Sequence, residues 1–185
     1  MGFLKRLFAR RDQIAQDVVR LIEEEQDRCC NMSDEELLAL SDEELLGVIW
    51  IRMERFSARF DTERRALDNM SAEQKNFYIT YYYMLQVNDG GLCQYFANSS
   101  RDTALFLSDA LEAVGAMEHR ELFEDFLHHN KVATAALLSF KVDNSADFKK
   151  MERSYPFEEF NADFYALPPM QSAIAAYVRE NVTVF

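Results

Sequence analysis

The chain has 185 residues, of which 49% are hydrophobic and 28% are charged, so its length and apolar content fit one domain with a sizeable core. Its 32 acidic residues outnumber 20 basic ones, which leaves a net charge of -12. This charge disfavours direct binding to DNA or RNA and favours a basic protein as partner.

The first eleven residues differ in charge from the rest of the chain. They hold four cations and no acid, so 16 basic and 32 acidic residues remain beyond Arg11. Their apolar residues fall on one side of a helix, which leaves contact of residues 1–11 with an anionic membrane as a minor alternative. The stripe continues to residue 22, which predicts one long amphipathic helix docked on the core. Its members are Phe3, Leu4, Leu7, Phe8, Ile14, Val18, Leu21 and Ile22.

Further helix starts are marked by capping boxes, in which a serine is followed three residues later by Glu or Gln. These serines are Ser33, Ser41 and Ser71. Proline is absent before Pro156, and apolar residues recur at helical spacing, so strands find little support. The sequence therefore predicts an all-α fold: a single compact multi-helix domain that begins with long amphipathic helices.

The helix that starts after Ser71 is rich in aromatic residues, which we expect to pack in the core. It ends where two glycines stand side by side, because glycine and asparagine tolerate the backbone of a helix C-terminus. A new helical turn follows at once, with Gln94 and Asn98 suited to bonding exposed backbone groups. An anion-binding nest at the glycines is the weaker alternative, since Asp89 would repel a phosphate. This structural motif comprises Asn88, Asp89, Gly90, Gly91, Gln94, Tyr95, Phe96 and Asn98.

Two helices are expected next, one ending at Gly115 and one over residues 118–129 with an acidic outer face. Residues 139–163 are polar and contain helix breakers, so we expect an irregular surface link there. Pro168 and Pro169 then precede a last amphipathic helix.

Three stretches resemble the bacterial DNA-mimic protein family: VNDGGLCQYFANSS at residues 87–100, then residues 110–116 and 157–177. The resemblance covers residues 77–179 as a family-like core of the single domain 1–185, whereas residues 1–75 match only in being helical and acidic. Asn161 stands where an aspartate is expected. The resemblance implies an all-helical monomer or homodimer whose acidic surface imitates duplex DNA and occupies the DNA-binding face of a transcriptional regulator.

Acidic residues at helical spacing are candidates for such a surface, because carboxylates three or four positions apart lie on one helix face. A solvated surface or stabilised helix N-termini explain the same residues equally well. The candidate partner-binding residues are Glu23, Glu24, Asp27, Asp34, Glu35, Asp42, Glu43, Glu118, Glu121 and Asp125.

An enzyme is the weaker hypothesis, because no catalytic or cofactor motif singles out a residue. The enzyme hypothesis would rest on a metal or small-ligand site built from Asp89, Glu124 and His128, with Glu124 four positions before His128. We predict no catalytic residue, no cofactor and no metal. The three cysteines lack zinc-type spacing, and a reducing cytoplasm is the expected compartment.

Overall fold

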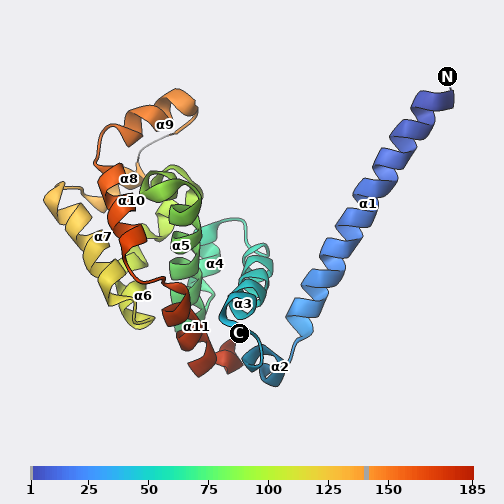
Figure 1. The fold of residues 1–185 in the computed structure, drawn as a ribbon, viewed down its shortest axis with the longest axis horizontal. Coiled ribbons are helices and arrows are strands. Elements are labelled where there is room, and N and C mark those ends of the chain that lie inside the picture. Colours follow the sequence, from blue (N-terminus) through green and yellow to red (C-terminus); the bar gives the residue numbers. More distant parts are fainter. Residues whose placement is uncertain (1, 140–141) are drawn as a thin grey trace.

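The structure is a computed structural model that describes residues 2–139 and 142–185, with side chains described at 16–136, 139 and 142–185 (Figure 1). Within these residues it forms eleven α-helices and two short 3-10 helices and contains no strand, which confirms the predicted all-α fold. The helices are α1 (Gly2–Asn31), α2 (Asp34–Leu38), α3 (Asp42–Ser57), α4 (Glu63–Asp68), α5 (Ala72–Ala97), η1 (Ser99–Phe106), α6 (Leu107–Ala113), α7 (Met117–His129), α8 (Thr134–Leu138), α9 (Ser145–Glu152), α10 (Phe157–Ala166), α11 (Gln171–Glu180) and η2 (Val182–Val184).

The predicted capping boxes are confirmed at the starts of α2, α3 and α5. At each start the serine side chain accepts a hydrogen bond from the backbone N–H three residues later, and the Glu or Gln at that position accepts from the serine N–H. These bonds hold the pKa of Glu36 and Glu44 below its ordinary value. The local sequence alone therefore determines where these helices begin.

Helix α1 is a single helix, as predicted, but the predicted docking of its apolar stripe on the core is wrong for Val18, Leu21 and Ile22. The stripe residues before Val18 and the membrane alternative for residues 1–11 lie outside the described side chains. Figure 1 shows α1 standing away from the body, and it packs against α3 only near its C-terminal end. Cys29 is buried there, whereas Val18, Leu21 and Ile22 are exposed. No helix in the described part of the chain is both long and apolar enough to cross a membrane.

Helix α5 forms the centre of the core, with α3, α6, α10 and α11 packed around it. Tyr83 lies fully buried, and its ring meets those of Tyr95, Phe123 and Phe164 edge to face. These four residues come from α5, α7 and α10. The aromatic residues of α5 are thus core residues, as the sequence predicted.

The C-terminal half agrees with the sequence except in one segment. Gly115 ends α6 with φ of +77°, and the neighbouring Ala116 N–H donates to Leu111 O, which is the bonding of a glycine C-cap. The irregular link expected at 139–163 was wrong in part, because α9 and much of α10 form there. Asn144 caps α9 through its side chain, and Phe157, Phe160 and Phe164 supply the buried face of α10. Asn144 and Pro156, which were interpreted as helix breakers, therefore stand at the starts of α9 and α10.

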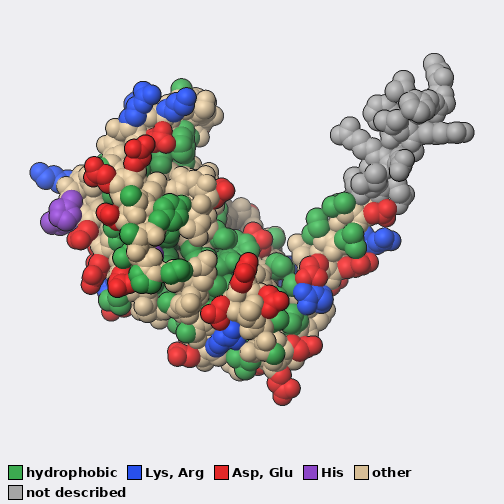
Figure 2. All heavy atoms as spheres, in the orientation of Figure 1, with side chains coloured by type: hydrophobic (Ala, Val, Ile, Leu, Met, Phe, Trp, Pro, Cys, Tyr) green, Lys and Arg blue, Asp and Glu red, His purple; other side chains and the backbone are tan. Residues whose placement is uncertain are grey.

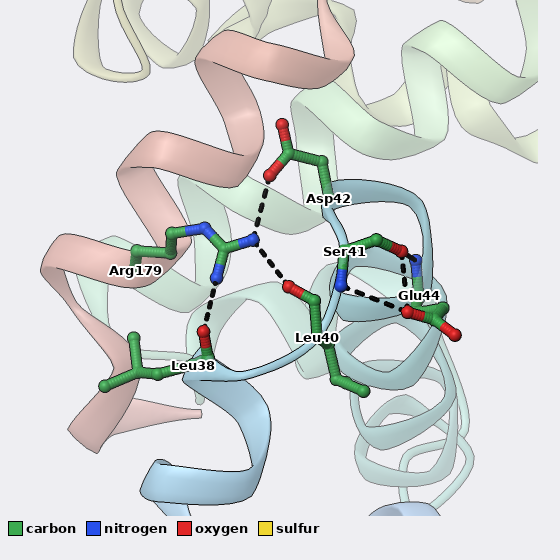
Figure 3. Close-up of polar contacts among 6 residues, drawn as sticks. All are labelled: Leu38, Leu40, Ser41, Asp42, Glu44 and Arg179. Atoms are coloured by element: carbon green, nitrogen blue, oxygen red, sulfur yellow. Dashed lines mark hydrogen bonds and ion pairs between the residues drawn. The ribbon is translucent and has the colours of Figure 1, made fainter.

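Two arginines fasten the N-terminal helices to the body. Arg179 of α11 donates to the backbone oxygens of Leu38 and Leu40 and to the carboxylate of Asp42, at 3.0, 2.9 and 2.8 Å (Figure 3). Arg52 of α3 likewise donates to Cys29 O at the end of α1 and to Phe185 O at the C-terminus. Arg52 therefore links the C-terminal end of α1 to Phe185.

Candidate acidic binding surface

The double glycine interrupts α5 as predicted. Gly90 and Gly91 have non-helical backbone angles, and Gly91 lies at φ of 77° and ψ of 179°, a region open only to glycine. The interruption leaves carbonyl groups without helical partners before the break and N–H groups without them after it. Helix α10 supplies partners on both sides. Asn161 Oδ1 accepts from Leu92 N–H at 3.0 Å, and the Tyr165 hydroxyl donates to Val87 O at 3.0 Å.

The side chain of Asn161 fills the space beside Gly91, where a Cβ atom would collide with it. It also occupies the Leu92 N–H that an anion nest would need, so the turn interpretation holds and the nest does not. Gln94 and Asn98 differ from expectation. They bond to side chains, Gln94 to Asp89 at 2.7 Å and Asn98 to Gln86 at 2.6 Å, because the two halves of α5 bring these polar residues together.

Helices α7 and α10 pack against each other and bring two acidic rows to one face. On α7 the row contains Glu118, Glu121 and Asp125, all exposed at positions i, i+3 and i+7. On α10 it contains Glu159 and Asp163, which line the same hollow as Asp125. We call these five residues the α7–α10 acidic face. Figure 2 shows acidic side chains along the edge of the body that α7 forms.

The sequence analysis predicted no binding residue on α10, because residues 139–163 were interpreted as a link. The signal was present in the spacing of Phe157, Phe160 and Phe164 at i, i+3 and i+7. That stripe predicts a helix, and a helix places Glu159 and Asp163 on its outer side, where the structure has them exposed.

The other seven candidate acids lie on α1, α2 and α3, at the opposite end of the body from α7 (Figure 1). Several of them have structural partners. Asp27 pairs with Arg55 at 2.6 Å, Glu24 lies 3.8 Å from Arg20, and Asp42 bonds to Arg179. Acids in the first turns of α2 and α3 also favour the helix dipole. These are Asp34, Glu35, Asp42 and Glu43. The structure therefore does not bring the ten predicted residues into one surface.

The acidic residues at the two ends of the body also differ in whether they pair with a cation. Among the described residues, no ion pair involves a member of the α7–α10 acidic face. Arg120 is the one arginine of α7 and α10, which contain no lysine, and it pairs with Glu112 and Glu124 at 2.7 and 2.9 Å. The five carboxylates of the face thus present uncompensated charge to a partner.

The residues of the alternative metal site do not meet. Asp89 accepts a bond from Gln94 at the α5 break, and Glu124 is paired with Arg120 on α7. Within the described residues, no three His, Cys, Asp or Glu side chains are placed to hold a metal ion together. The third histidine, His119, is buried, and its Nε2 donates to Pro168 O at 2.8 Å. Burial lowers the pKa of His119, and its Nδ1 has no hydrogen-bond partner among the described residues.

Comparison with known proteins identifies the family of this chain. The model of the DMP19-like protein family matches residues 68–181, which run from the end of α4 through α11 and include the break in α5 and both helices of the α7–α10 acidic face. Neither the curated proteins nor the solved structures contain a match. The match covers more than half of the chain, which therefore belongs to the DMP19-like protein family.

Proposed function

We propose that this protein is a DNA mimic that binds a basic protein, such as a DNA-binding regulator, through the α7–α10 acidic face. The observation that carries the proposal is the hollow between α7 and α10, where Asp125, Glu159 and Asp163 come together without a lysine or arginine among its lining residues. The hollow also has an apolar floor, to which Leu122, Phe126 and Phe160 contribute. A basic side chain could place its charge on the rim and its methylenes on this floor.

The charge along this face is of the order needed to compete with duplex DNA. The face carries five acidic side chains that pair with no cation among the described residues. A helix of the length of α7 extends about 20 Å, so the charge of the face amounts to about one per 4 Å, against about one per 1.7 Å of axis for the duplex. Packed helices lie about 8–10 Å apart, so the two rows form a double line of charge. Such a face would attract a DNA-binding surface at long range.

The acids of α1, α2 and α3 are the second candidate face for the same partner. They lie outside the residues that match the family, whereas the α7–α10 acidic face lies inside them. Several of the N-terminal acids also have the structural partners described above. These two observations favour α7 and α10 as the primary contact.

The test compares two variants with the same change in charge. The first is Glu121→Lys, Asp125→Lys and Glu159→Lys on the proposed face. The second is Glu23→Lys, Glu35→Lys and Glu43→Lys, which spares the Asp42–Arg179 contact. Both variants and the unmodified protein are immobilised on a resin and exposed to a bacterial lysate. Captured proteins are then eluted with competing duplex DNA. Circular dichroism of each variant establishes that its helices are intact.

The proposal predicts capture of a DNA-binding protein that duplex DNA displaces, that the first variant loses and that the second retains. In a gel-shift assay the unmodified protein should release the captured protein from its own DNA. Loss with the second variant alone would move the contact to α1, α2 and α3. Equal loss with both variants would show that net charge acts without a defined surface. Capture that duplex DNA does not displace would refute mimicry.

A further inference from the structure

The proposed binding surface does not account for the exposed apolar side of α1. Four aliphatic side chains there have exposed fractions of about one half: 49% for Val18, 53% for Val19, 59% for Leu21 and 52% for Ile22. Val18, Leu21 and Ile22 line an open hollow together with Ile51 of α3. In Figure 1 α3 lies near the C-terminal part of α1, and the rest of α1 stands away from the body. An amphipathic helix gains most of its stability by burying its apolar stripe, so this stripe calls for a partner.

We propose that a second copy of this chain covers the stripe, with the two α1 helices packed side by side and antiparallel. The argument for this occupant is the charge along the helix. Residues 2–11 carry four cations and no acid, whereas residues 12–31 carry six acids and two arginines. In an antiparallel pair the basic end of each helix meets the acidic part of the other, and the two-fold axis repeats this match. A parallel pair would set like charges together.

The position of the exposed residues also favours a protein partner over an anionic lipid surface. Leu21 and Ile22 are followed directly by Glu23, Glu24 and Glu25, and the chain beyond Arg11 contains twice as many acids as bases. An anionic membrane would repel this part of the helix together with the body. A second α1 would instead offer its own cations to these acids.

The base of α1 is built to hold the helix at a fixed angle. Arg52 donates to Cys29 O and, at 2.5 Å, to Met32 O, and Arg55 pairs with Asp27. Cys29 is 1% exposed against the core. A helix fastened in this way presents its stripe to a partner without first being ordered, which lowers the entropic cost of association. The segment lies outside the family match, so the inference is independent of the proposed function.

Light scattering coupled to size exclusion, with the full chain at micromolar concentrations, tests the proposal. The expected mass is twice 21.6 kDa. The variant Val18→Gln, Leu21→Gln and Ile22→Gln should raise the dimer dissociation constant by at least about tenfold, because burying the exposed half of each aliphatic side chain contributes about half to one tenfold step and each chain loses three of them. These residues are exposed in the single chain, so its helix content should persist. Leu38→Gln with Leu105→Gln, two exposed leucines elsewhere, is the matched control and should remain a dimer.

Charge exchange tests the antiparallel direction. Lys5→Glu with Arg6→Glu should weaken the dimer, and so should Glu23→Lys with Glu24→Lys. All four changes in one chain should restore it, because only an antiparallel pair then regains opposite charges at both ends. A monomeric unmodified protein would overturn the proposal, and its sedimentation with phosphatidylserine vesicles would assign the stripe to lipid. A dimer that survives the triple glutamine variant would place the interface elsewhere, and failure of the combined exchange would refute the antiparallel arrangement.

Discussion

Alanine at Gly91 should destabilise the protein through two separate effects. At φ of 77° and ψ of 179° a side chain is strained by about 1–3 kcal/mol. The added Cβ would also collide with the Asn161 side chain, whose bond to Leu92 N–H would be lost at a cost of about 0.5–1.5 kcal/mol. We therefore expect Gly91→Ala to lower the free energy of unfolding by about 2–4 kcal/mol.

Two other glycines provide controls that separate these effects. Gly115 also has φ of +77°, but nothing lies within 4 Å of its added Cβ, so Gly115→Ala should cost only the strain of about 1–2 kcal/mol. Gly47 lies inside α3 with open space around it, so Gly47→Ala should raise the free energy of unfolding by up to about 1 kcal/mol.

The assay is urea unfolding of the four proteins, followed by circular dichroism at the helix band. A second series adds Asn161→Ala to the unmodified protein and to Gly91→Ala. Asn161→Ala should lower the free energy of unfolding less in Gly91→Ala than in the unmodified protein, by about 0.5 kcal/mol or more, because the bond of Asn161 to Leu92 N–H is already broken there. A cost of Gly91→Ala no greater than that of Gly115→Ala, or additive costs of Gly91→Ala and Asn161→Ala, would refute the predicted clash with Asn161.

Three further predictions follow from buried or shared polar groups. Arg179→Met should lower the free energy of unfolding by about 2–3 kcal/mol in the same assay, since three bonds to a charged, partly exposed side chain are lost; a loss below about 0.5 kcal/mol, the usual effect of a surface substitution, would contradict this. The pKa of His119 is lowered in the fold, so the stability from its neutral form is full above pH 6.5, the ordinary value, and is lost as the pH falls toward the lowered pKa. The free energy of unfolding of the unmodified protein minus that of His119→Gln should therefore decrease as the pH falls. A difference that does not change with pH would contradict this prediction. Burial raises the pKa of the Cys93 thiol to about 12 and also raises that of Cys29. Dithionitrobenzoate at mildly alkaline pH should therefore modify half-buried Cys30 first, and a fast reaction that persists in Cys30→Ser would refute this.

The sequence by itself determined the features that depend on neighbouring residues. The helical periodicity predicted the all-α fold, and the serine capping boxes placed the starts of α2, α3 and α5, because such bonds span only three residues. The break at Gly90 and Gly91 was predicted for the same reason, since its cause is the backbone freedom of glycine.

Tertiary structure alone decided which distant residues meet. Asn161 lies 69 positions from Leu92 yet satisfies its N–H, and no local pattern encodes that pairing. In the same way α10 joins α7 to form the acidic face, while Arg179 engages Asp42, 137 positions away. The apolar stripe of α1 was visible in the sequence, but its exposure was not, because periodicity specifies that a face is apolar and not what covers it. Packing between distant helices therefore decided which of the predicted charged and apolar faces are open to a partner.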